Sequence, residues 1–272
     1  MTEFFRRYNE VEPFENDLYE TSINYKNIAP SQLLEELFAK KNPLLVNVSN
    51  TPKYFWDSLN VTFYKYYPAL KNAVNFNYAD SLQIPGLIKK EKNRPVVLYN
   101  NTNYGAAELA RWLNQKGIPN VAYLVGNVYL FYEYVVNENL TGQANKFLKM
   151  NSSIHFITPS LFCDKMTGSK IIDLRHDTVF NKITQGAKYN YKHLKNAVNF
   201  FAGKGMREFV QQFSDKKTEY TLISENGIDG LTLADDLTKK GYKINWIIGG
   251  MQRWEWYMNN VETFKCMDYL VK

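Results

Sequence analysis

The stretch LKNAVNF occurs twice in this chain, at residues 70–76 and again at residues 194–200. Other identities keep the same spacing of 124 residues, so they belong to one internal repeat. These further matches are Leu109 with Leu233, Ala110 with Ala234, Leu113 with Leu237, Gly117 with Gly241, and Gly126 with Gly250. A repeat as long as an ordinary domain indicates that one structural unit is built twice within 272 residues.

Both copies show the same series of apolar segments. Continuous apolar runs, typical of buried parallel strands, lie at 44–48, 96–100 and 121–125 and again at 171–174, 220–224 and 244–248. Helices are predicted at 105–116 and 230–240, each closed by a glycine, and another helix follows each third strand. This alternation predicts an α/β fold with two doubly wound domains, each a central parallel sheet flanked by helices.

The repeat also sets the expected domain boundaries. We expect an N-terminal extension at 1–27, a first domain at 28–140, a polar linker at 141–153, a second domain at 154–262 and a C-terminal tail at 263–272. The extension has no partner in the repeat and mixes aromatic with charged residues. We expect it to lie on a surface.

Composition excludes several classes of function. The net charge of +6 is spread along the chain without a run of five basic residues, so no nucleic-acid partner is expected. The two cysteines, Cys163 and Cys266, belong to no closely spaced set of Cys or His residues, so we expect neither structural zinc nor a disulfide framework. We expect each cysteine to be buried or incidental, and we expect no cofactor. No stretch of 18 uninterrupted apolar residues occurs, so no transmembrane span is predicted.

The second copy, read in order, resembles a rhodanese domain. It contains IIDLR at 171–175, LKNAVNF at 194–200, TLISENGIDG at 221–230 and IIGGMQRWEWY at 247–257. The rhodanese family shows, in the same order, a strand ending in Asp-x-Arg, a segment of the type GAiN, a strand leading into a Cys-headed loop, and a Gly-Gly-x-x-x-Trp ending. The repeat makes the chain similar to tandem rhodanese-like proteins of the thiosulfate or mercaptopyruvate sulfurtransferase type over about residues 28–260.

What the resemblance implies about chemistry depends on one missing residue. In the family a loop cysteine attacks a sulfane sulfur and carries it as a persulfide, but Asn100 and Ser224 hold that position here. Neither side chain can form a persulfide. Asp229 stands where the loop often carries a cation, which disfavours anions. The structural Asp-x-Arg pair of the family is kept as Asp173 and Arg175.

We therefore expect a catalytically inactive protein that acts as a structural or scaffolding subunit of a larger protein complex. A divergent sulfurtransferase is one alternative. A regulatory module that binds small anions is another, and its loop comprises Ser224, Glu225, Asn226, Gly227, Ile228, Asp229 and Gly230.

The helix after Gly126 bears on the partner prediction because it is apolar on every side, with Glu133 as its one charge between residues 128 and 136. Such a helix must be buried all round, either by the rest of the chain or by a protein partner. The interface candidates are Val128, Leu130, Phe131, Tyr132 and Val135. We expect an intracellular protein, first in a mitochondrial complex, with the cytoplasm or a cilium as alternatives.

Overall fold

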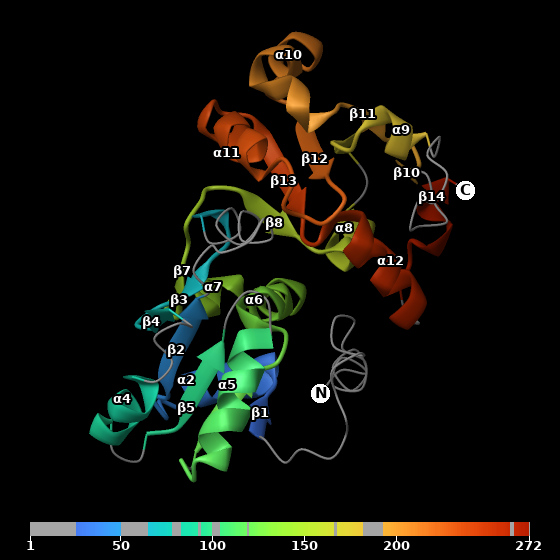
Figure 1. Cartoon of the computed structure of the whole chain (residues 1–272). Coiled ribbons are helices and arrows are strands. Elements are labelled where there is room, and N and C mark those ends of the chain that lie inside the picture. Colours follow the sequence, from blue (N-terminus) through green and yellow to red (C-terminus); the bar gives the residue numbers. More distant parts are fainter. Residues whose placement is uncertain are drawn as a thin grey trace. The chain divides into compact units, whose positions relative to one another are not determined.

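The apolar runs of the two copies form two separate parallel sheets. The computed structural model describes residues 26–49, 65–77, 83–91, 94–99, 104–118, 120–165, 168–181, 193–261 and 264–271 (Figure 1). The chain divides into two units, Met1–Asn151 and Ser152–Lys272. Most of the N-terminal extension, residues 1–25, lies outside the described residues.

The first unit follows the predicted alternation. Its strands are β1 (Lys26–Ile28), β2 (Leu44–Ser49), β3 (Ala69–Leu70), β4 (Val74–Asn77), β5 (Val96–Tyr99), β6 (Val121–Leu124) and β7 (Leu148–Lys149). Its helices are α2 (Pro30–Phe38), α4 (Ile84–Lys90), α5 (Tyr104–Gln115), α6 (Asn127–Asn137) and α7 (Thr141–Ala144). The main sheet has the order β1-β6-β5-β2-β4, and all of its pairings are parallel.

The second unit repeats this plan. Its strands are β8 (His155–Ile157), β9 (Lys170–Asp173), β10 (His193–Leu194), β11 (Val198–Asn199), β12 (Glu219–Ile223), β13 (Lys243–Ile247) and β14 (Leu270–Val271). Its helices are α8 (Pro159–Lys165), α9 (Asp177–Phe180), η2 (Ala202–Lys204), α10 (Gly205–Gln212), α11 (Leu231–Lys239), α12 (Gly250–Asn260) and η3 (Met267–Tyr269). The main sheet, in the order β8-β13-β12-β9-β11, is again wholly parallel. The predicted fold class is thus confirmed.

Each sheet is buried because helices cover it. In the second unit α10 and α11 lie together beside β12 and β13, while α8 and α12 pack against each other (Figure 1). In the first unit α5 packs on β5 and β6, and α2 contacts α6. The apolar stripe of α5 faces the sheet, and Ala110 and Leu113 are fully buried against strand residues such as Leu98. Burial on both faces explains why these strands read as continuous apolar runs.

The repeated LKNAVNF forms a tight corner between two strands in each unit. Its leucine, Leu70 or Leu194, is buried, and its first asparagine, Asn72 or Asn196, has a positive φ of 61° or 60°. Asparagine tolerates this left-handed conformation better than most residues with a Cβ atom. The asparagine at this position in both copies therefore fits the backbone of the corner.

The segments expected to be linker and tail instead contain matching secondary structure. In the first unit β7 returns to pair antiparallel with β3, and Leu148 lies opposite Leu70. In the second unit β14 pairs antiparallel with β10, and Leu270 lies opposite Leu194. We call residues 141–149 and 264–271 the return segments. The stretch 141–153 is therefore largely part of the first unit, which ends at Asn151.

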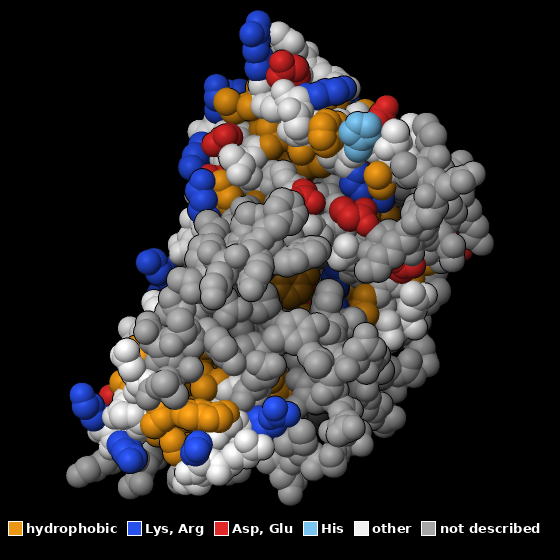
Figure 2. Space-filling model, viewed as in Figure 1, with side chains coloured by type: hydrophobic (Ala, Val, Ile, Leu, Met, Phe, Trp, Pro, Cys, Tyr) orange, Lys and Arg blue, Asp and Glu red, His pale blue; other side chains and the backbone are white. Residues whose placement is uncertain are grey.

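Helix α6 is covered by this chain itself. The five interface candidates Val128, Leu130, Phe131, Tyr132 and Val135 are each at most 7% exposed. The expectation that an apolar face is left for a partner is therefore corrected, because the described surface shows only Met150 and Phe201 as exposed large hydrophobic residues. On the face drawn in Figure 2, Lys and Arg side chains lie scattered, with Asp and Glu among them.

Among the described residues, no helix combines the length and the apolar character needed to cross a bilayer.

The corner of the repeated motif gives a first testable prediction. Asn196→Ala should lower the free energy of unfolding by about 1 kcal/mol, because a Cβ-bearing residue without a short polar side chain is disfavoured at this φ. Asn196→Gly is the matched control and should change it by less than about 0.5 kcal/mol. Urea denaturation of the full chain measures both. Equal losses in the two variants would show that the side chain of Asn196, rather than its backbone, is what the corner needs.

Candidate functional site

The candidate site lies at the carboxyl ends of the two central strands of the second unit. β9 and β12 are parallel neighbours, and Ile223 at the end of β12 lies opposite Asp173 at the end of β9. The chain passes from β9 outward to β11 on one side, whereas β12 lies on the other side of β9. Such a reversal of strand order opens a crevice at the carboxyl end of a parallel sheet, where ligands commonly bind. Ser224 is the first residue beyond β12.

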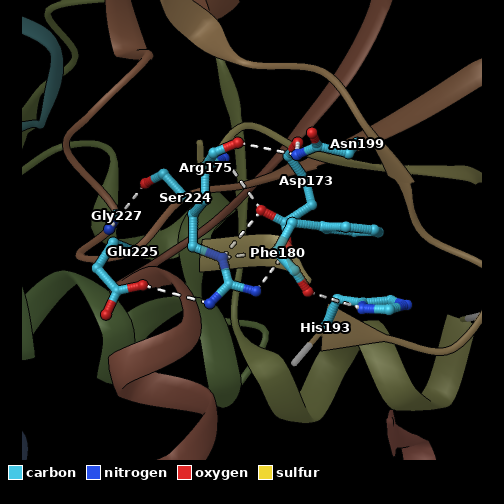
Figure 3. Close-up of polar contacts among 8 residues, drawn as sticks. All are labelled: Asp173, Arg175, Phe180, His193, Asn199, Ser224, Glu225 and Gly227. Carbon is cyan, nitrogen blue, oxygen red and sulfur yellow. Dashed lines mark hydrogen bonds and ion pairs between the residues drawn. The ribbon is translucent and has the colours of Figure 1, made fainter. Parts of the chain in front are cut away.

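Ser224 is held inside the protein. It is 1% exposed, and its Oγ accepts a hydrogen bond from the backbone N–H of Gly227 at 3.1 Å. Its carbonyl oxygen accepts another from the N–H of Met251 at 2.9 Å. The position at which the family resemblance implies a nucleophile is thus occupied by a buried hydroxyl. Its hydrogen bond with Gly227 holds the loop together (Figure 3).

The amide groups of the loop also bond to side chains of the loop itself. Oδ1 of Asn226 accepts from the N–H of Ile228 at 2.9 Å and from the N–H of Asp229 at 3.1 Å. Together with Gly227, three successive amides of the predicted anion-binding loop already have an acceptor. An incoming anion would have to displace these side chains before it could use those amides.

Glycines bring the loop into direct backbone contact with the start of α12. Gly227 has a φ of +72°, and a Cβ atom placed on it would lie 2.3 Å from the nitrogen of Gly249. A Cβ atom on Gly250 would lie 2.2 Å from the carbonyl oxygen of Ser224. These contacts explain both the glycine in the loop and the Gly-Gly pair at the start of α12.

A buried ion pair underlies the loop. The carboxylate of Asp173 is fully buried and accepts from the backbone N–H of Arg175 at 3.0 Å, from Nε at 3.0 Å and from Nη2 at 2.7 Å. Nη1 of Arg175 reaches Oε2 of Glu225 at 3.3 Å (Figure 3). Asp173 already balances the charge of Arg175, so Glu225 and Asp229 leave the site with an excess of negative charge.

Burial alters the titration of both loop carboxyls. It raises the pKa of Glu225, with Arg175 acting in the opposite direction. It also raises the pKa of Asp229, against the lowering effect of the hydrogen bond to Asn226. The site therefore disfavours further negative charge, including the charge of an anionic ligand.

Asn199 connects the repeated motif to this site. Its Nδ2 donates to the carbonyl oxygens of Asp173 at 3.1 Å and Arg175 at 2.8 Å (Figure 3). In the first unit Asn75 holds the same place in the motif and accepts a hydrogen bond from Nδ2 of Asn47 at 3.0 Å. A neutral amide pair thus occupies the strand end that carries an ion pair in the second unit.

The remaining polar residues of interest are Asn100 and the three histidines. Asn100 lies outside the described residues, so the loop of the first unit is not characterised. The three histidines contact other groups than Ser224, with His155 at Asn245, His176 at Thr178, and His193 at the carbonyl oxygen of Phe180. His193 also stacks on the ring of Phe180 (Figure 3). The described residues contain no group of His, Cys, Asp or Glu suited to a metal ion.

The expectation for the cysteines is wrong. Cys163 in α8 and Cys266 in the second return segment form a disulfide, with their Cα atoms 5.8 Å apart. Residues 103 positions apart become neighbours only through the fold, so their sequence spacing gave no sign of the bond.

Comparison with known proteins agrees with this architecture. A family model described as the rhodanese-like domain matches residues 30–133 and 158–256, which together make up most of the chain. The crystal structure of Tum1 protein from Saccharomyces cerevisiae is 13% identical with a TM-score of 0.34, and the match covers 91% of this chain and 98% of that chain. No curated protein matches the chain.

Two other solved structures show similar matches. Thiosulfate sulfurtransferase from Pseudomonas aeruginosa is 11% identical with a TM-score of 0.31, over 85% of this chain and 42% of that chain. A rhodanese-related protein from Thermoplasma volcanium is 17% identical with a TM-score of 0.31, over 37% of this chain and 90% of that chain. At these TM-scores the likenesses add nothing about the geometry of the site. The two matches of the family model carry the assignment.

The closed loop predicts a stability cost when its hydroxyl is removed. Ser224→Ala should lower the free energy of unfolding by about 1–2 kcal/mol, because the buried hydrogen bond from the N–H of Gly227 to Oγ is lost. Chemical denaturation of the full chain measures this loss. Ser169→Ala, in which a partly buried hydroxyl bonded to Thr221 is removed, serves as the control and should cost less. If Ser224→Ala is the milder of the two, the Oγ of Ser224 does not hold the loop closed.

The raised pKa of Glu225 predicts a pH-dependent effect. A raised pKa means that the folded protein binds the proton more tightly than the unfolded chain. The resulting stability is present below the ordinary pKa of about 4.5 and is lost as the pH rises through the raised value. Glu225→Gln escapes this loss, so its melting temperature relative to the wild type should increase between pH 4 and pH 7.

Thermal unfolding at a series of pH values checks this trend. Glu208→Gln, at an exposed position on α10, controls for the loss of one surface charge. If Glu225→Gln becomes less stable relative to the wild type as the pH rises, the ion pair with Arg175 outweighs the cost of burial.

Proposed function

This chain belongs to the rhodanese-like domain family in both of its halves, and we propose that it is a catalytically inactive member that serves as a structural subunit of a larger protein complex. Its partners in this proposal are other proteins. The setting is a complex inside the cell, with a mitochondrial one as the first choice.

The state of the cysteines carries this proposal. The sulfur transfer implied by the family resemblance needs a thiolate that can take up a sulfane sulfur. The sequence contains two cysteines, Cys163 and Cys266, and the structure joins them in a disulfide. Neither stands at the loop positions Asn100 and Ser224. With the disulfide formed, the protein has no thiolate to carry sulfur.

The Ser224 loop supports the same conclusion. A group that receives sulfur from a donor must be reachable, whereas Ser224 is buried and bonded to Gly227. The loop amides at Ile228 and Asp229 are occupied by Asn226. The acidic excess from Glu225 and Asp229 also opposes anionic donors such as thiosulfate.

A structural role fits a protein that keeps its fold but lacks the groups needed for sulfur transfer. The second unit retains the buried pair of Asp173 and Arg175, the glycine contacts and the corner at Asn196. All of these features maintain backbone geometry. Two intact cores give a stable platform for protein contacts, which we propose as the function that remains.

An assay of sulfur transfer tests the absence of catalysis. The purified protein, supplied with thiosulfate or 3-mercaptopyruvate and with cyanide as acceptor, should form thiocyanate no faster than buffer does. Ser224→Cys should stay equally inactive, because the new thiol would be buried beside Glu225. Activity in the wild type would overturn the proposal. Its loss in Cys163→Ser or Cys266→Ser would then identify the sulfur carrier.

The structural role has its own measurement. The tagged protein, extracted gently from its own cells, should migrate in a particle much larger than its 31.8 kDa with a reproducible set of companion proteins. A free monomer contradicts the subunit proposal. A thermal shift with phosphate, sulfate or thiosulfate, strengthened by Asp229→Arg, would instead favour a module that binds small anions.

A further inference from the structure

The two return segments make corresponding contacts with the motif corners of their own units. The N–H of Lys71, in the first corner, donates to the carbonyl oxygen of Phe147 at 2.8 Å. The N–H of Lys195, in the second corner, donates to the carbonyl oxygen of Tyr269 at the same distance. Each segment also pairs a buried leucine with the leucine of the repeated motif. The structure therefore offers an internal comparison of how such a segment is held in place.

The first return segment is fastened by non-covalent contacts alone. The ring of Phe147 meets the ring of Phe38, on α2, edge to face at 5.4 Å. Nζ of Lys146 lies 4.5 Å from the centroid of the Phe38 ring, and Nζ of Lys71 donates to the carbonyl oxygen of Asn145. These contacts suffice to bring β7 onto β3, so the strand pair needs no covalent bond.

The second return segment carries a covalent bond at the corresponding helix. Cys266 is joined to Cys163 on α8, and beside it Nζ of Lys265 pairs with Oδ1 of Asp164 at 2.7 Å. At the start of the segment Phe264 packs against Trp254 and Tyr257. Phe264 thus anchors the start of the segment on α12. The residues after Phe264 are held by the disulfide, the ion pair and the short β10–β14 pairing.

The two sulfur atoms belong to residues that differ in burial. Cys266 is 5% exposed, whereas Cys163 is only half-buried. Thiol–disulfide exchange requires a thiolate to approach one sulfur in line with the bond. We take Cys163 as the residue whose sulfur is attacked, with Cys266 as the leaving group.

We propose that the disulfide between Cys163 and Cys266 is a thiol-sensitive latch on the second return segment, opened by a dithiol reductant. The thiolate of the reductant attacks the sulfur of Cys163, and Cys266 leaves as a thiolate that takes up a proton. The second thiolate of the reductant then attacks its own sulfur in the mixed disulfide and releases Cys163. Two electrons reduce the protein disulfide to two thiols, and the reductant is oxidised to a disulfide.

Opening the latch removes the covalent tie between α8 and residues 264–271 while the parallel sheet stays intact. The antiparallel pair of β10 and β14 has only two residue pairs. A segment held by so few backbone hydrogen bonds opens easily once a tether is lost. Reduction should therefore free β14 from β10 and expose the second corner, without a matching change in the first unit.

Mass spectrometry of the full chain tests whether the latch exists. Protein purified without reductant and denatured in N-ethylmaleimide should show no adduct, and two adducts after treatment with dithiothreitol. Two adducts without reduction, in protein equilibrated with an oxidised glutathione buffer, would overturn the proposal. This assay reads the disulfide, on which the proposed function also draws, whereas thiocyanate formation reads catalysis, so the failure of one proposal can be told from the failure of the other.

Hydrogen exchange tests whether the bond acts as a latch. On reduction of the wild type, peptides covering 264–271 and 193–197 should exchange at least about tenfold faster. Peptides covering 147–149 and 69–73 serve as the control within the same molecule and should not change. Cys163→Ser should reproduce the fast exchange without reductant, and dithiothreitol should then have no further effect. Identical exchange of 264–271 in oxidised and reduced wild type would show that the disulfide does not control the opening of this segment, and would overturn the proposal.

Discussion

The buried carboxylate of Asp173 must be satisfied where β9 ends, and the surrounding structure is arranged to do so. A buried charge is stable only when it is paired and hydrogen-bonded, and removal of one partner of such a pair typically costs about 3–5 kcal/mol. Arg175 supplies three donors within its own turn, which fixes the chain direction after the strand. Asn199 then bonds to the carbonyl oxygens of both residues, and Glu225 approaches the outer side of the guanidinium. The sheet end, the repeated corner and the Ser224 loop are therefore positioned by one ion pair.

The internal repeat made most of the fold predictable, because each strand and helix of one copy was checked by its counterpart in the other. Continuous apolar runs such as 96–99 reflect burial on both faces of a sheet, which leaves a strong signal in sequence. The two return strands, β7 and β14, left almost no such signal in the sequence. Each is only two residues long, and in each a single leucine, Leu148 or Leu270, is buried. The disulfide was missed because proximity of residues in different elements depends on the complete fold.

Residue identities at the candidate site were predictable, whereas their interactions were not. The sequence indicates that Ser224 stands at the end of a central strand and that Asp229 brings a negative charge. Whether Ser224 is offered to a ligand depends on how the loop folds back, and here Asn226 and Ser224 use their own side chains as acceptors. For helix α6, burial was predictable, whereas the structure that covers the helix was not. Its apolar surface correctly indicated burial, but composition does not tell which partner covers a helix, and the structure shows that this chain covers it.

Each unit ends by returning to the middle of its own sequence. The strand that follows the last long helix is paired with the strand that opens the motif corner, so the chain closes on itself before it goes on. The boundary between the units, at residues 151 and 152, falls after the return strand rather than after the last long helix. A chain divided there would leave each return strand with its own pairing partner.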